Sequence, residues 1–332
     1  MSEVINIKEL NERIERESVF VDTLRAEMSK VIVGQTHLID TLLIGLLSNG
    51  HILLEGVPGL AKTLAITTLA KAVDADFARI QFTPDLLPAD LIGTLIYSQK
   101  SEEFMVRKGP VFANFVLADE INRSPAKVQS ALLEAMQERQ VTIGDDTYKL
   151  PEPFLVLATQ NPVEQEGTYP LPEAQLDRFL FKVLVPFPTL EELGEIVQLT
   201  TTGEEKTAQK AADGDTILRL RAIAREVPVA PAVQQFALKL VLGTHPELPD
   251  SPAIARSFLR FGASPRAAQA IFSAARVRAL MQGRFNVSFE DVAAVAKSCL
   301  RHRIALNFEG MAQGQTADGI IDELLKTEKA AC

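Results

Sequence analysis

The most constraining feature of this chain is a short apolar run that leads directly into a turn rich in glycine and proline and then into a Lys-Thr pair. Residues 51–63 read HILLEGVPGLAKT. Ile52 to Leu54 predict a buried strand, and Leu64 to Val73 predict a helix. The order of strand, glycine-rich turn and helix start is typical of loops that bind phosphate.

The physical reason lies in the backbone of the turn. Several of its N–H groups can point into one hollow, and the N-terminus of the following helix adds positive potential there. Lys62 supplies a mobile cation for the outer phosphates, and the Thr63 hydroxyl can ligate Mg²⁺. A glycine-rich turn that binds nothing is the alternative from this stretch alone. The candidate nucleotide-binding residues here are Gly56, Val57, Pro58, Gly59, Leu60, Ala61, Lys62, Thr63 and Leu64.

Ala61 departs from the usual pattern of such loops, which have glycine before the lysine. We expect this position to enter the helix, where alanine is tolerated if φ is negative. The methyl group must then clear the phosphates.

A short apolar turn at residues 31–35 precedes a predicted helix at 36–48. Next to a nucleotide-binding loop, such a turn favours an adenine pocket, with Val33 and Gly34 as the candidate residues. An ordinary packed turn explains this stretch equally well.

Two acidic residues, Asp119 and Glu120, directly follow the apolar run at residues 115–118. At the carboxyl edge of a parallel sheet, both carboxylates would lie beside the phosphate-binding turn. We expect Asp119 to hold Mg²⁺ through water and Glu120 to orient and activate the attacking water. A surface Asp-Glu turn would be the better explanation if the segment stood alone.

Asn161 follows another apolar run, at residues 154–159, and precedes Pro162. A side-chain amide at this point can hydrogen-bond the attacking water or the γ-phosphate. A turn that merely ends the strand is the alternative, because Asn-Pro commonly terminates regular structure.

Three arginines are candidates for contact with the γ-phosphate. Arg178 precedes the last predicted strand and could reach the nucleotide of a neighbouring subunit, with Arg123 as the second candidate for that role. Arg266 follows Pro265 at the start of a predicted helix and can face the nucleotide. The alternatives are a surface ion pair between Arg178 and Asp177, and a solvated arginine at a helix start.

The remaining pattern predicts two domains. Alternating runs predict one β-hairpin near residues 95–106, inserted in or beside a helix, and a second at 140–150, both with polar tips. After Pro188 the strand signals stop. We therefore expect an α/β domain with a parallel sheet over residues 1–188, including an N-terminal helix, and an all-helical domain over residues 189–332. The polar segment from 201 to 215 predicts a mobile loop.

The composition of the chain limits the kinds of molecule that we expect the protein to bind. The chain has 332 residues, of which 47% are hydrophobic, and a formal net charge of −9. The lack of a dense run of Lys and Arg argues against a duplex-DNA binder. Cys299 and Cys332 suggest neither a disulfide framework nor a zinc site. The charged N-terminal segment is not a signal peptide, and no apolar run approaches about 18 residues, so we expect a cytoplasmic protein without a membrane span.

Five separated motifs together resemble the MoxR family of AAA+ ATPases, in that family's order and over nearly the whole chain. They are GVPGLAKT at 56–63, LADEINRSP at 117–125, ATQNP at 158–162, EAQLDRF at 173–179 and GASPRA at 262–267. The alanine before the lysine is itself typical of the family. The resemblance implies an αβα nucleotide-binding domain with inserted hairpins and a helical lid.

The resemblance also implies the roles of particular residues. Lys62 and Thr63 would be the Walker A residues, and Asp119 and Glu120 the Walker B residues. The remaining assignments are Asn161 as sensor 1, Arg178 as arginine finger and Arg266 as sensor 2. Whether Arg266 would act within its own subunit or on a neighbour stays open.

The function that the resemblance implies is that of a hexameric, chaperone-like motor. Its cofactors would be ATP and Mg²⁺, and its partners a protein with a von Willebrand factor A domain and a client, such as a metalloenzyme complex under maturation. Two alternatives share the same motifs. One is a nucleotide-gated binding scaffold with slow hydrolysis, and the other is a DNA-remodelling ATPase, against which the acidic charge counts.

Overall fold

The computed structural model describes residues 7–57, 61–100, 102–161, 167–201 and 206–330. The chain divides into two compact units. We call residues 22–179 and 183–218 the sheet unit. We call the residues up to Val21, residues 180–182 and those from Arg219 onward the helical unit. The domain boundary after residue 188 stays a prediction.

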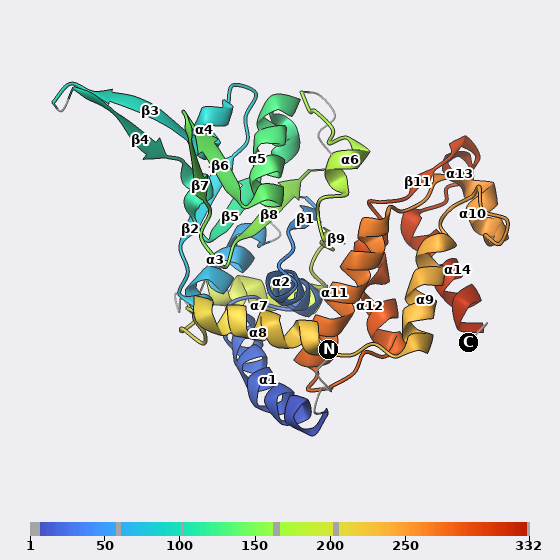
Figure 1. Cartoon of the computed structure of the whole chain (residues 1–332). Helices are drawn as coiled ribbons and strands as arrows, with labels where there is room; N and C mark the ends of the chain where they lie inside the picture. Colours follow the sequence, from blue (N-terminus) through green and yellow to red (C-terminus); the bar gives the residue numbers. More distant parts are fainter. Residues whose placement is uncertain (1–6, 58–60, 101, 162–166, 202–205, 331–332) are drawn as a thin grey trace, which may run out of the picture. The chain divides into compact units, whose positions relative to one another are not determined.

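A five-stranded sheet forms the centre of the α/β part of the chain, in the order β2-β5-β8-β1-β9 (Figure 1). Parallel pairing joins β2 to β5, β5 to β8 and β8 to β1. Because these four strands run in one direction, their carboxyl ends meet at one edge of the sheet. The strands are β1 (Ile52–Glu55), β2 (Phe77–Gln81), β5 (Phe115–Asp119), β8 (Leu155–Gln160) and β9 (Phe181–Leu184).

Helices cover both faces of this sheet, as the alternation of apolar side chains requires. Leu53, Val116 and Val156 form one core with Leu132 and Met136 of α5 (Ala126–Glu138). On the opposite face, α2 (Thr36–Leu47) packs closely on β1, and α3 (Lys62–Val73) lies against β5. The fold is therefore the expected mixed α/β arrangement with a parallel sheet between helices.

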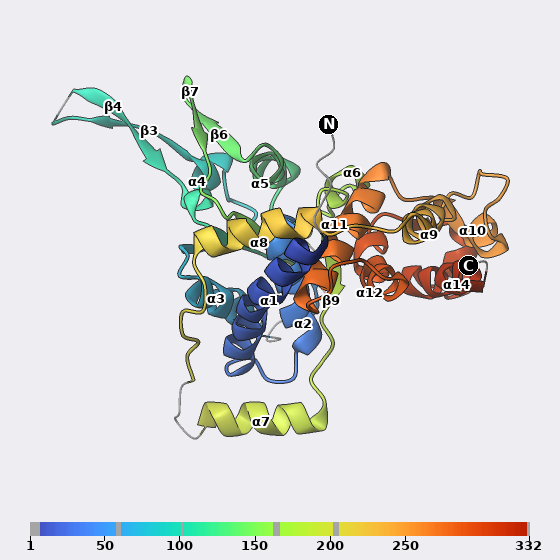
Figure 2. The ribbon, with the colours of Figure 1, turned by 60° about the horizontal axis from the view of Figure 1, so that its bottom comes forward.

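Both predicted β-hairpins are present. The first follows α4 (Pro88–Ile92) and pairs β3 (Gly93–Ser98) with β4 (Glu103–Lys108), and the second pairs β6 (Gln140–Ile143) with β7 (Asp146–Lys149). Figure 2 shows the β3–β4 hairpin extending away from the sheet. Its turn is polar, as expected, but its strands expose large apolar side chains. These are Leu95, Ile96, Tyr97, Phe104 and Met105.

The segment that follows the sheet begins with α7 (Leu190–Thr201), and none of the residues of this helix is buried. After it, residues 206–213 are held by backbone bonds from Ala211 and Ala212 to the Ala72 carbonyl, and Lys210 pairs with Asp74. The expectation of a loop from 201 to 215 is wrong at its two ends, because Thr201 belongs to α7 and Gly214 and Asp215 belong to α8 (Gly214–Glu226). The mobility of this segment stays a prediction.

The helical unit contains short strands that the sequence did not predict. β10 (Leu259–Phe261) and β11 (Ala305–Leu306) pair antiparallel. Strands of two or three residues are too short to produce a detectable alternation. The helices of the unit are α9 (Pro231–Leu242), α10 (Ala253–Phe258), α11 (Pro265–Met281), α12 (Phe289–Leu300), α13 (Phe308–Ala312) and α14 (Ala317–Ala330), with parts of α1 (Ile7–Ser29) and α8 (Gly214–Glu226).

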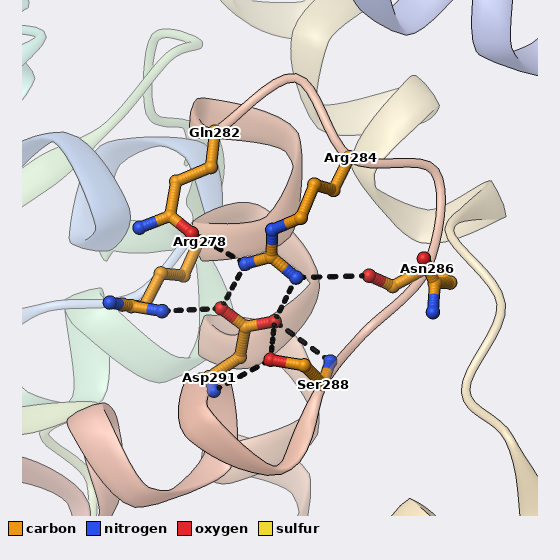
Figure 3. A network of polar contacts seen from close by, with 6 residues as sticks. All are labelled: Arg278, Gln282, Arg284, Asn286, Ser288 and Asp291. Carbon is orange, nitrogen blue, oxygen red and sulfur yellow. Dashed lines mark hydrogen bonds and ion pairs between the residues drawn. The ribbon is translucent and has the colours of Figure 1, made fainter.

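A buried carboxylate joins α11 to α12 (Figure 3). Asp291 is 0% exposed and accepts hydrogen bonds from Arg278 and Arg284, at 2.5 and 2.6 Å, and from the Ser288 backbone N–H at 2.8 Å. Burial raises the pKa of the Asp291 carboxyl, but the bonds from Arg284, Ser288 and Arg278 outweigh burial and lower the pKa below its ordinary value. This network fixes the turn between the two helices.

Two further observations concern the described part of the chain. No helix in it combines the length and apolar character needed to cross a bilayer. Cys299 is buried in α12, and burial raises the pKa of its thiol to about 12, so the thiol stays protonated and unreactive.

Candidate functional site

A cavity of about 450 Å³ lies at the carboxyl edge of the sheet, where the candidate residues converge. It collects side chains from the start of α3 and from the ends of β2, β5 and β8. Its lining residues are Ala61, Lys62, Thr63, Leu64, Arg79, Gln81, Asp119, Glu120, Thr159 and Asn161. Strands far apart in sequence therefore supply one site, as expected for this edge of a parallel sheet.

Lys62 and Thr63 are the first two residues of α3, and their backbone lies in the helix turn that faces the cavity. The Lys62 ammonium donates to the Gly56 carbonyl at 2.6 Å. Burial lowers the pKa of the Lys62 ammonium from its ordinary value, and the carboxylates of Asp119 and Glu120 oppose that shift. The side chain thus offers a half-buried positive charge beside the helix N-terminus, a favourable place for an anion.

The expectation that Ala61 enters the helix is wrong, and the negative φ under which alanine would be tolerated there is not found. Ala61 is the N-cap of α3 and has φ 54° and ψ 17°, in the left-handed region. It lies outside the helix, at the point where the chain turns into it. A left-handed backbone at this point explains why glycine is the usual residue in such loops.

Asp119 and Glu120 lie at the end of β5, as the sequence predicted, and Thr159 of β8 joins them. The Thr159 hydroxyl donates to Asp119 Oδ1 at 2.6 Å and accepts from the Glu120 backbone N–H at 2.8 Å. Glu120 has φ 56°, another left-handed residue, so its side chain leaves the line of the strand. The buried threonine therefore fixes both acids relative to the sheet.

Sequence reasoning missed two polar residues of β2, Arg79 and Gln81. The Arg79 guanidinium donates to Asp119 Oδ2, and the Gln81 amide donates to Glu120 Oε2 at 2.8 Å. Arg123, the second candidate for a neighbour's γ-phosphate, donates to Glu120 of its own chain at 3.1 Å. The available signal was the alternation of polar Arg79 and Gln81 with apolar Ile80 and Phe82, which placed two polar side chains on one face at the strand end.

Asn161 lies directly after β8, is 7% exposed and lines the cavity. Gly56 and Val57 follow β1. The other three candidates in the turn, Pro58, Gly59 and Leu60, lie outside the described residues.

Several candidate residues do not line this cavity, among them Val33, Gly34, Arg178 and Arg266. Val33 and Gly34 lie in the turn before α2, where a Cβ on Gly34 would meet the Glu192 carboxylate of α7. Arg178 is exposed, and its Nη1 donates to the Leu133 carbonyl of α5 at 3.2 Å. Arg266 belongs to the helical unit, in the first turn of α11, where its N–H donates to Ser264.

The side chains in the cavity fit Mg²⁺ held together with phosphate. Thr63 and Asp119 provide hard oxygen donors, the kind of ligand that Mg²⁺ prefers. Among the described residues, no group of three or more His, Cys, Asp and Glu could form a metal cage. Mg²⁺ does not need such a cage, since it keeps several waters and binds through one or two protein ligands and substrate phosphates.

The chain is similar to known proteins over most of its length. A family model described as "ATPase family associated with various cellular activities (AAA)" matches residues 51–181, and a model of the AAA lid domain matches residues 252–324. Chaperone MoxR1 of Mycobacterium tuberculosis is 50% identical over 91% of this chain and 80% of its own length. Protein MoxR of Paracoccus denitrificans is 30% identical over 85% of this chain and 87% of its own.

A solved structure supports the same relationship. The crystal structure of a putative ATPase from Cytophaga hutchinsonii superposes with a TM-score of 0.88 at 48% identity, covering 96% of each chain.

Proposed function

This chain belongs to the MoxR family of AAA+ ATPases, and we propose that it binds and hydrolyses ATP with Mg²⁺ in a ring assembly that remodels a partner protein. The observation that carries the proposal is the single cavity that brings together Lys62, Thr63, Asp119, Glu120 and Asn161. These residues come from three separate elements and supply the cation, metal ligands and polar groups that phosphoryl transfer needs.

The roles follow from the chemistry of the side chains. Lys62 and the N-terminus of α3 would neutralise the β- and γ-phosphates. Thr63 and Asp119 would hold Mg²⁺, which supplies charge neutralisation on the phosphate oxygens. Glu120 would orient and activate the attacking water, and Asn161 would hydrogen-bond that water or the γ-phosphate.

We propose a ring because the positive charge of Arg178, the candidate arginine finger, is missing from the cavity of its own chain. Arg178 is exposed and bonded to the α5 carbonyl of Leu133, outside the cavity of its own chain. An arginine that stabilises the transition state from a neighbouring subunit would need such an exposed position. The exposed arginine supports a neighbouring subunit, and we propose a homo-hexamer, the assembly that the family resemblance implies, with Arg266 of the lid as a further phosphate contact.

The partners proposed are a client protein and a protein with a von Willebrand factor A domain. The β3–β4 hairpin supports a client contact, since it exposes Tyr97 at 51%, Phe104 at 70% and Met105 at 58%. Apolar side chains exposed together on a projecting element commonly mark an interaction site. Among relatives, the name of Chaperone MoxR1 from Mycobacterium tuberculosis is consistent with this role.

The variant Glu120→Gln tests the hydrolysis step. It preserves the size and hydrogen bonding of the side chain but removes the carboxylate that would activate water. We expect hydrolysis to fall by a factor on the order of 10²–10⁴ with little change in nucleotide affinity. Steady-state phosphate release and binding of a fluorescent ATP analogue measure the two quantities separately.

Two outcomes would support other functions. Wild-type binding of ATP with no turnover, even in a single-turnover experiment with a client present, would favour the nucleotide-gated scaffold. DNA binding that weakens steeply with salt would favour the DNA-remodelling ATPase. The client itself should be recovered by pull-down with the Glu120→Gln variant in ATP.

A further inference from the structure

Arg79 is the strongest unassigned feature of the site. It extends from β2, an edge strand of the sheet, and its side chain is 50% exposed. Its guanidinium donates to Asp119 Oδ2 through Nη2 at 2.5 Å and through Nε at 3.2 Å. Both bonds end on the same carboxylate oxygen, and each joins a charged donor to a charged acceptor, which makes it stronger than a bond between neutral groups.

The contact leaves Asp119 with no oxygen free of a strong donor. Its Oδ1 accepts from the Thr159 hydroxyl at 2.6 Å, and Oδ2 accepts from Arg79. The two donors differ in an important way. Thr159 is 1% exposed and fixed within β8, whereas Arg79 can turn into solvent without leaving a cavity. Of the two, Arg79 is therefore the donor that can leave.

A magnesium ion bound beside Asp119 would compete with this guanidinium. Both are cations, and both are attracted to the same carboxylate oxygen. Close approach of the ion would place two positive groups a few ångströms apart in a partly enclosed site, where their repulsion is less screened than in water. The metal ion and the Arg79 guanidinium therefore cannot both bind Asp119 Oδ2 as strongly as either would alone.

We propose that Arg79 is a displaceable counter-cation of Asp119, which holds the carboxylate in the metal-free protein and is released when Mg²⁺ and nucleotide bind. This inference rests on the proposed function, because it concerns the same Mg²⁺ site. Arg79 acts as a positioning residue. It keeps Asp119 oriented while the site has no metal, and it weakens metal binding by the work needed to displace it.

The test compares nucleotide affinity with and without the metal. A fluorescent, non-hydrolysable ATP analogue is titrated into wild-type protein and into Arg79→Met, once with Mg²⁺ and once with EDTA. Methionine keeps an unbranched stem similar to that of arginine but has no guanidinium and no charge. Because the ion no longer has to displace a charge-assisted hydrogen bond, we expect the variant to bind the Mg²⁺ complex about tenfold more tightly. Its affinity in EDTA should be unchanged or weaker.

Two further variants separate charge from geometry. Arg79→Lys keeps the charge but loses the two-pronged contact, so its Mg²⁺ affinity should lie between those of wild type and Arg79→Met. Arg107→Met removes an exposed arginine on the distant β4 strand and should behave as wild type.

The outcomes distinguish this inference from the proposed function. If wild-type protein binds no nucleotide, or binds it equally in Mg²⁺ and EDTA, the proposed site itself is wrong. If wild type depends on Mg²⁺ but Arg79→Met binds the Mg²⁺ complex no more tightly, the counter-cation role is wrong. Weaker binding of the variant under both conditions would make Arg79 a phosphate ligand instead.

Discussion

At the residue scale, two of the residues that line the cavity have a left-handed backbone conformation. Ala61 has φ 54° at the start of α3, and Glu120 has φ 56° at the end of β5. Neither residue is glycine, so each conformation costs energy that the surrounding fold must supply. At Glu120 the turn directs a carboxylate toward the cavity, whereas at Ala61 the methyl group has no such use in the nucleotide-free protein.

The substitution Ala61→Gly should therefore relieve strain. A left-handed alanine costs roughly 1–2 kcal/mol, and glycine removes this strain. The larger conformational entropy of glycine in the unfolded chain offsets part of the resulting stabilisation. We expect the free energy of unfolding to rise by up to about 1 kcal/mol, measured by urea denaturation without nucleotide. The control is Ala65→Gly within α3, which should lose at least about 1 kcal/mol because glycine disfavours a helix interior and a buried methyl group is removed. If Ala61→Gly lowered the free energy of unfolding as much as Ala65→Gly does, the backbone of Ala61 would not be strained.

At the element scale, the α11–α12 junction depends on one carboxylate. Asp291 accepts bonds from two arginines and from the Ser288 turn, and a neutral or absent side chain would leave those donors without a charged partner (Figure 3). Removing one partner of a buried pair is usually far more costly than losing a surface pair.

Asp291→Ala should destabilise the protein by about 3–5 kcal/mol, seen as a lower thermal midpoint of the transition that includes the helical unit.

The pKa of Asp291 is lowered on folding, so the folded state binds fewer protons than the unfolded state just below pH 4. The contribution of this network is therefore complete above about pH 4 and is lost as the pH falls through the folded pKa. Asp291→Asn should show a smaller loss of stability than wild type between about pH 5 and pH 3; an identical loss would contradict the assignment.

The β3–β4 hairpin is the second element with a consequence of its own. Tyr97 and Phe104 face each other across the strands, with ring centroids 5.4 Å apart, yet both are largely exposed. Gly93 has φ 104°, and a Cβ there would lie 2.3 Å from the Arg107 carbonyl, so the base of the hairpin depends on glycine. A hairpin with a fixed base and exposed apolar side chains is consistent with a surface that contacts another protein.

The double variant Tyr97→Ser/Phe104→Ser should reduce binding of a dye that reports exposed apolar surface, and it should reduce client recovery in the Glu120→Gln background. Nucleotide affinity should stay at its wild-type value, because the hairpin does not line the cavity. As a control, Thr94→Ser/Arg107→Ser alters side chains of the same ribbon without removing an aromatic ring. Equal client recovery from all three proteins would argue against a role for the aromatic pair.

At the scale of the whole molecule, the main question is whether one chain contains a complete catalytic set. The cavity holds five of the proposed catalytic and metal-binding residues, but Arg178 lies outside it. If a neighbour supplies that arginine, hydrolysis becomes a property of the assembly. Specific activity should then rise with protein concentration until assembly is complete.

Mixing two inactive variants tests this directly. Arg178→Ala retains Glu120, and Glu120→Gln retains Arg178, so a subunit interface between them can contain both native residues. Random mixing in equal amounts should restore about a quarter of the wild-type rate, because one interface in four carries the productive combination. An arginine that acts within its own chain would give no recovery, and the two variants measured separately provide the baselines.

Much of the site was predictable because its chemistry depends on local order along the chain. The apolar runs that precede Lys62-Thr63, Asp119-Glu120 and Asn161 each predicted a strand followed by functional residues at one sheet edge, and the cavity confirms that they meet. Both hairpins were also predictable, since alternation is a property of neighbouring residues.

What only the tertiary structure decided depends on contacts between distant segments. The left-handed backbone at Ala61 follows from how the chain must enter α3, and the strands β10 and β11 are too short to signal themselves. The pairing of Arg79 with Asp119, 40 residues away, exists because β2 lies beside β5 in register. Local sequence specifies which groups a strand carries to its end, but the order of the strands in the sheet determines which groups meet, and that order is set by the packing of the whole core.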